Sequence, residues 1–63
     1  MKSAISIGGD ILSVEIDRTA AGYQASCLER VLGSLQRLTA SGATYDDALT
    51  ALREAVLKSR HGA

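Results

Sequence analysis

The 63-residue sequence predicts a small α+β protein. Apolar and polar residues alternate over residues 12–17, and the alternation resumes over residues 23–27 after a break that contains a glycine. Residues 45–56 instead carry apolar side chains at helical spacing. We therefore expect a small antiparallel β-sheet, made of a hairpin plus one or two short strands, packed against an amphipathic C-terminal helix.

The N-terminal segment predicts a short strand. Ile5 and Ile7 alternate with Ser6, and the segment ends in Gly8-Gly9-Asp10, which is a strong turn signal. The pattern does not establish whether residues 1–10 join the main sheet, and this remains open at this point.

The hairpin begins with a clean period-two pattern, which places alternate side chains on opposite faces of a strand. The core-facing side chains expected in its first strand are Leu12, Val14 and Ile16. Those expected in its second strand are Tyr23, Ala25 and Cys27. Gly22 supplies the backbone freedom of the turn between them. A helix over residues 17–27 is the competing interpretation, but it would place Gly22 in a helix interior.

Residues 28–38 are ambiguous. Their apolar side chains fit helical spacing, at Leu28, Val31, Leu32, Leu35 and Leu38. Gly33 interrupts that pattern, and the segment spans only about three turns. We assign a short helix here, with residues 36–41 as a possible strand.

The C-terminal helix has signals at both ends. Thr44 is a good N-cap, Asp46 and Asp47 follow in the first turn, and Gly62 marks the end. One apolar stripe runs along it, formed by Tyr45, Ala48, Leu49, Leu52, Ala55 and Val56. Leu57 lies outside this stripe and is a candidate for a second contact surface.

The composition restricts the function classes. Seven basic and seven acidic residues are spread along the chain, and the only aromatic residues are two tyrosines. Binding of nucleic acid by the chain alone is not expected, because such binding concentrates basic charge or uses stacking aromatic side chains. No segment is long and apolar enough for a membrane span, and no signal peptide is recognised, so we expect a cytoplasmic protein with its single cysteine reduced.

A chain this short buries only about 60% of the surface that its unfolded form exposes, so a monomer would be marginally stable. One cysteine cannot form an internal disulfide. Neither can one cysteine and one histidine form a zinc quartet. Stabilisation by self-association is the remaining route, so we expect a homo-oligomer, either a dimer or a larger assembly.

No catalytic, cofactor-binding or metal-binding residues are predicted. Cys27 alternates with core residues and has no nearby base, and His61 lies near the C-terminal end. Glu15 and Asp17 share a polar strand face with Asp10 close by, which is more typical of a solvated face than of a metal site. The Gly8-Gly9 pair lacks the residues of a phosphate-binding loop. We therefore expect no enzyme and no cofactor.

Protein binding is the remaining activity, through the polar hairpin face or an exposed strand edge. The candidate partner-binding residues are Glu15, Asp17, Tyr23, Gln24 and Leu57.

The order of motifs resembles HicB-like antitoxins over about residues 11–58. A strand of alternating aliphatic residues, a glycine turn and a second strand that begins Tyr23-Gln24-Ala25 are followed by Gly42-Ala43-Thr44. A helix with the acidic pair Asp46-Asp47 and then Ala48-Leu49 completes the pattern. The connection before Gly42 is longer than is usual in the family and lacks its frequent proline.

The resemblance implies a partial RNase H-like fold that binds and masks a HicA-like RNA-cleaving toxin. We expect a single HicB-like domain over residues 1–63 without the C-terminal DNA-binding module that many members carry. Two alternatives remain open: a ribbon-helix-helix type DNA-binding regulator, and a small phage- or plasmid-type inhibitor of a host protein.

Overall fold

The protein consists of four β-strands followed by one α-helix. The computed structural model describes residues 1–62. The strands are β1 (Lys2–Ile7), β2 (Asp10–Thr19), β3 (Gly22–Val31) and β4 (Ser34–Gly42), and the helix is α1 (Tyr45–Gly62). This arrangement is the expected α+β class: β2 and β3 form the expected hairpin, and β1 and β4 are the two further strands of the sheet.

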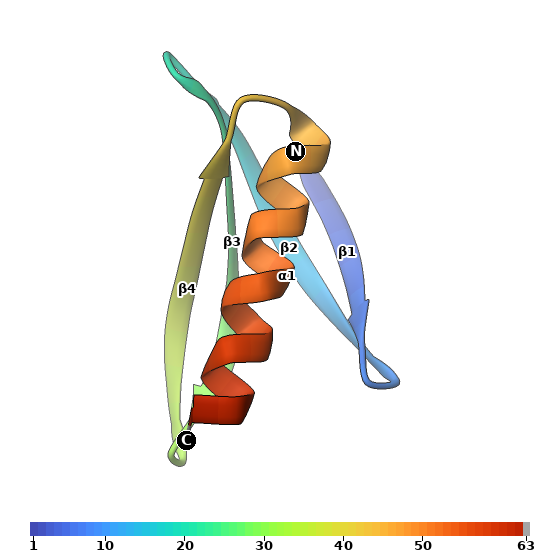
Figure 1. Ribbon diagram of the computed structural model, residues 1–63, viewed down its shortest axis with the longest axis vertical. Helices are drawn as coiled ribbons and strands as arrows, with labels where there is room; N and C mark the ends of the chain where they lie inside the picture. The colour runs from blue at the N-terminus through green and yellow to red at the C-terminus, as the bar shows by residue number, and fades with distance from the viewer. Residues whose placement is uncertain (63) are drawn as a thin grey trace.

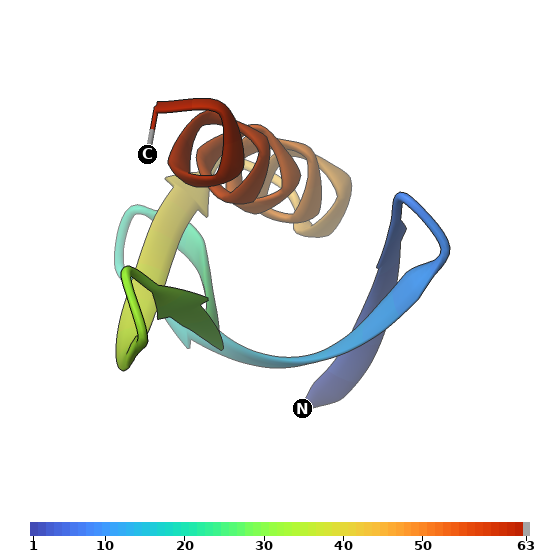
Figure 2. The same cartoon turned by 90° about the horizontal axis from the view of Figure 1, so that it is seen from below.

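The strands form one antiparallel meander in the order β1-β2-β3-β4. α1 runs along one face of the sheet, where it packs mainly on β3 and β4 (Figure 1). Seen along the helix, the sheet curves around α1, and the β1–β2 hairpin forms the far wall of the curve (Figure 2). The opposite face of the sheet carries no helix. β1 and β4 are the two edge strands.

The core lies between α1 and the concave face of the sheet. Its buried hydrophobic residues are Ile7, Val14, Ile16, Ala25, Cys27, Ala48, Leu52 and Val56. Ile16 and Leu52 are the largest side chains that are almost fully buried. The aliphatic positions expected from the period-two and helical patterns therefore meet in a single core, with Leu12 half-buried at its margin.

Two hairpin turns are short because backbone with positive φ closes them. Gly8 and Gly9 have φ values of 55° and 88°, the left-handed pair that two-residue hairpin turns require. Leu32 and Gly33 occupy the equivalent places between β3 and β4, with φ values of 51° and 84°. The N-terminal segment thus joins the sheet through a glycine turn, which answers the question left open by the sequence.

The junction between β4 and α1 depends on two close backbone approaches. A Cβ atom on Gly42 would lie 2.5 Å from the backbone nitrogen of Ala48, and one on Gly22 would lie 2.4 Å from the carbonyl oxygen of Gly42. Thr44 then caps the helix, since its Oγ1 accepts a hydrogen bond from the backbone N–H of Asp47 at 3.1 Å. Packing therefore explains Gly42, and helix capping explains Thr44.

The short helix assigned to residues 28–38 is wrong. Residues 22–31 form β3, Leu32 and Gly33 form the turn, and β4 begins at Ser34. The strand considered for residues 36–41 is present within β4, and the competing helix over residues 17–27 is absent. Helical spacing of leucines gave the wrong element because Leu28, Leu32 and Leu35 are exposed instead of forming a buried stripe.

Candidate functional site

The sheet face that carries no helix, which we call the open face, is the first candidate binding surface. It presents alternate side chains of all four strands, including Ile11, Ser13, Glu15, Asp17, Gln24, Ser26, Leu28, Arg30, Leu35, Arg37 and Thr39. Most of these residues are exposed, whereas alternate residues of β2 and β3, such as Val14, Ile16, Ala25 and Cys27, are buried in the core.

Three of the five predicted binding residues lie together on the open face. Asp17 is directly opposite Gln24 in the β2–β3 register, and Glu15 is opposite Ser26. All three predicted residues, Glu15, Asp17 and Gln24, are exposed. The predicted polar hairpin face is thus a real and continuous part of the surface.

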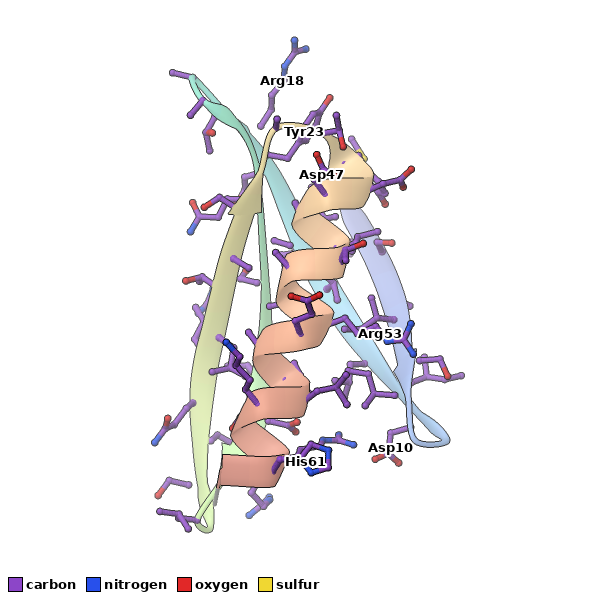
Figure 3. All side chains as sticks on the ribbon, in the orientation of Figure 1. Asp10, Arg18, Tyr23, Asp47, Arg53 and His61 are labelled. Carbon is purple, nitrogen blue, oxygen red and sulfur yellow. The ribbon has the colours of Figure 1, made fainter. Side chains whose placement is uncertain are left out.

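Tyr23 and Leu57 do not belong to this surface. Tyr23 is half-buried on the helix side, where its ring meets Tyr45 edge to face with centroids 6.2 Å apart. It lies near the beginning of α1 (Figure 3). Leu57 is half-buried near the other end of α1 and packs against the core. The five predicted residues therefore do not form one site.

Several exposed residues of the β3–β4 hairpin were not predicted to bind. Leu28, Leu32 and Leu35 are 56%, 86% and 63% exposed. In the register Leu28 faces Arg37, and the next pair on the same face joins Arg30 and Leu35. This places two leucines and two arginines in a checkerboard at one end of the open face. The available sequence signal was Gly33, which marks a turn and should have broken the helix assignment.

A groove crosses the centre of the open face. It has a volume of about 290 Å³ and is lined by Ser13, Glu15, Ser26, Cys27, Leu28 and Arg37. Ser26 forms its base and is only 9% exposed, although its strand neighbours on this face are exposed. Glu15 and Arg37 stand on opposite sides of Ser26, one on β2 and the other on β4.

The second feature is the edge of β1. The ammonium group of Met1 donates to the carbonyl oxygen of Ile16 at 3.0 Å, and the Ile16 N–H donates back to the Met1 carbonyl at 2.7 Å. Hydrogen-bonded and non-hydrogen-bonded pairs alternate along an antiparallel ladder. The backbone N–H and C=O groups of Lys2, Ala4 and Ser6 therefore point away from β2, toward the outside of the sheet.

A second groove runs beside this edge, between β1 and α1. It has a volume of about 300 Å³ and is lined by Ile5, Ser6, Leu49, Thr50 and Arg53. Ile5 and Leu49 are half-buried, and Arg53 extends from α1 toward β1 (Figure 3). Binding by β-strand addition uses two such features. An unpaired strand edge supplies backbone hydrogen bonds, and an adjacent apolar groove receives side chains of the added strand.

Two titratable side chains, Cys27 and Glu29, are buried on the helix side of the sheet. Burial raises the pKa of the Cys27 thiol, so the thiolate that a nucleophile requires is disfavoured. Glu29 is 8% exposed and accepts a hydrogen bond from the Arg60 guanidinium at 2.8 Å, which lowers the pKa of its carboxyl group. His61 lies exposed in the last turn of α1 (Figure 3).

Over residues 1–62 no three histidine, cysteine, aspartate or glutamate side chains come close enough to hold a metal ion. Glu15 and Asp17 thus have no third acidic partner in this part of the chain. No helix of these residues is long and apolar enough to cross a membrane.

The fold and its surfaces define a small α+β protein with an uncovered sheet face and a free strand edge beside a groove. Comparison with protein-family models, curated proteins and solved structures finds no match to this chain.

Proposed function

We propose that the chain is a non-enzymatic protein-binding module, a HicB-like antitoxin that masks a small RNA-cleaving toxin. The observation that carries the proposal is the free edge of β1 beside the groove against α1. The family proposal itself comes from the order of motifs over about residues 11–58, from the alternating strand to the capped helix.

Strand addition fits this edge better than side-chain docking alone. Three residues of β1 direct backbone donors and acceptors outward, so an extended segment of a partner gains a ladder of hydrogen bonds. The half-buried Ile5 and Leu49 then receive one apolar side chain of that segment. Lys2 is the only charged residue on β1 and lies at its first position, so the centre of the edge carries no charge or proline that would oppose pairing.

The ribbon-helix-helix alternative has less support, since that fold needs two helices after its strand and residues 1–62 contain only α1. An inhibitor of a host protein would use the same masking mechanism, so only the identity of the partner separates it from the leading proposal.

The test begins with co-expression of the chain with its neighbouring open reading frames, followed by the mass of the purified complex from light scattering. A stable complex with a small basic protein that cleaves RNA, and whose cleavage stops at equimolar chain, supports the proposal. A chain that purifies without any neighbour's product contradicts the toxin assignment.

A proline variant tests the surface. Ala4→Pro removes an outward N–H of β1 but leaves the β1–β2 ladder intact, because that N–H does not bond to β2. We expect it to weaken the complex by about tenfold or more. Ala4→Val keeps the N–H and is the matched control. Equal affinities of the two variants would exclude strand addition at β1.

A further inference from the structure

The groove of the open face is bordered by side chains of opposite charge. Glu15 on β2 and Arg37 on β4 flank Ser26 with opposite charges, and Leu28 supplies an apolar wall between them. Within the described residues neither Glu15 nor Arg37 forms an ion pair, since the close charge pairs all involve Arg60. Both charges are therefore available to a second molecule.

We propose that the open face is a self-association surface, on which a second copy of this chain packs face to face across the groove. In a two-fold interface a contact from one residue to another is repeated in the opposite sense. Glu15 of each copy then meets Arg37 of the other, and the two Leu28 side chains cover the grooves. The Glu15–Arg37 ion pair thus occurs twice in the dimer.

The charge and size of the chain favour a second copy over another partner. The net charge is zero, so two copies do not repel each other as a whole. The chain exposes 4275 Å², compared with about 3,900 Å² expected for a compact monomer of its mass. Leu28 and Leu35, more than half exposed on the same face, account for part of the apolar surface that association would bury.

This inference does not depend on the proposed toxin, because it uses the open face, whereas the proposed toxin-binding surface is the β1 edge with the groove against α1. A dimer formed through the open face leaves the outward backbone groups of β1 available. The two proposals can therefore fail separately.

Sedimentation equilibrium of the full chain over about 1 µM to 1 mM tests the proposal. The mass is expected to rise from 6.6 kDa toward twice that value with concentration. Glu15→Arg and Arg37→Glu each place like charges opposite each other, so each should raise the dimer Kd by about tenfold or more. The double variant restores opposite charges and should return the Kd to within about threefold of the original.

Glu54→Arg is the matched control, because it makes the same charge change at an exposed position of α1 away from the open face. Its dimer Kd should equal that of the unchanged chain, and circular dichroism should show every variant folded. A monomer at all concentrations overturns the proposal, as does a dimer that is insensitive to both single reversals. A monomer that binds phosphatidylglycerol vesicles through Leu28 and Leu35 would overturn it too, by assigning the face to a lipid surface.

Discussion

Arg60, in the last turn of α1, donates a hydrogen bond from Nε to Oε2 of Glu29 on β3 at 2.8 Å. Its Nη1 also lies 3.3 Å from Oδ2 of Asp10, at the start of β2. One guanidinium group thus connects the end of the helix to two strands. Glu29 would otherwise be a nearly buried carboxylate without a charged partner, and such a group opposes folding.

This contact predicts a pH dependence of stability. The hydrogen bond from Arg60 lowers the pKa of Glu29 below its ordinary value of 4.5. A carboxyl group whose pKa is lower in the folded than in the unfolded state stabilises the fold above the unfolded value. That contribution is lost as the pH falls through the folded pKa. Urea unfolding at pH 7 and about pH 2.5 should show this loss.

Glu29→Gln isolates the contribution of the carboxylate. At pH 7 the variant should be less stable by about 1 kcal/mol, because a neutral amide replaces the charged acceptor. At low pH the difference from the unchanged chain should shrink. Asp17→Gln, on the open face and outside this contact, is the control. A difference that stays constant with pH would show that Glu29 ionisation does not stabilise the fold.

The approach of α1 to β4 predicts a steric effect at Gly42. A Cβ atom there would lie 2.5 Å from the Ala48 nitrogen and 2.6 Å from the Asp47 carbonyl carbon, both in the backbone of the first helical turn. Gly42→Ala should therefore lower the free energy of unfolding by at least about 2 kcal/mol, measured by urea denaturation.

Gly8→Ala provides the comparison. Its Cβ atom would meet nothing within 4 Å, but the residue has a φ of 55°, so it should cost only about 1 kcal/mol of backbone strain. If Gly42→Ala were as mild as Gly8→Ala, the close approach of the helix would not be a constraint on the fold.

The hairpin and the C-terminal helix were predictable because each has a local signal. Alternation in β2 matches the pleat, and Thr44 with the following acidic residues marks the start of α1. The β3–β4 hairpin had only Gly33 as a local turn signal, and the helical spacing of its leucines outweighed that signal. Its turn contains Leu32 where hairpins favour asparagine or glycine, and its leucines carry helical spacing although Leu28 and Leu35 lie on an uncovered face.

The candidate surfaces were predictable only in part. Alternation correctly placed Glu15, Asp17 and Gln24 on one face, because strand side chains alternate regardless of tertiary structure. The groove between β1 and α1 depends on the curvature of the sheet and on where the helix crosses it. Neither property is local, so no motif in the sequence indicates that Ile5 and Leu49 lie across one groove.

Thr44 predicts a capping effect that is separate from packing. Its side chain is exposed, and its one described hydrogen bond is accepted from the Asp47 N–H. Thr44→Ala should destabilise the protein by about 1 kcal/mol in thermal or urea unfolding, whereas Thr44→Ser keeps the acceptor and should change it little. Equal losses in both variants would point to the methyl group instead of the cap.

Leu32 predicts a stabilising substitution. It has a φ of 51°, a conformation that costs an L-residue with a bulky side chain about 1 kcal/mol, and its side chain is 86% exposed. Leu32→Asn creates an Asn-Gly turn, the pair favoured in two-residue hairpins, and removes little buried surface. Urea unfolding at low protein concentration should show a gain of about 0.5 to 1 kcal/mol.

Leu35→Asn makes the same chemical change three residues later, in β4, where asparagine is a poor strand residue. This control should be neutral or destabilising. A gain at both positions would mean that removing an exposed leucine, and not relieving the turn, is the cause. A loss at Leu32 alone would show that its side chain makes a stabilising contact in solution, in which case the strained backbone is held there by that contact.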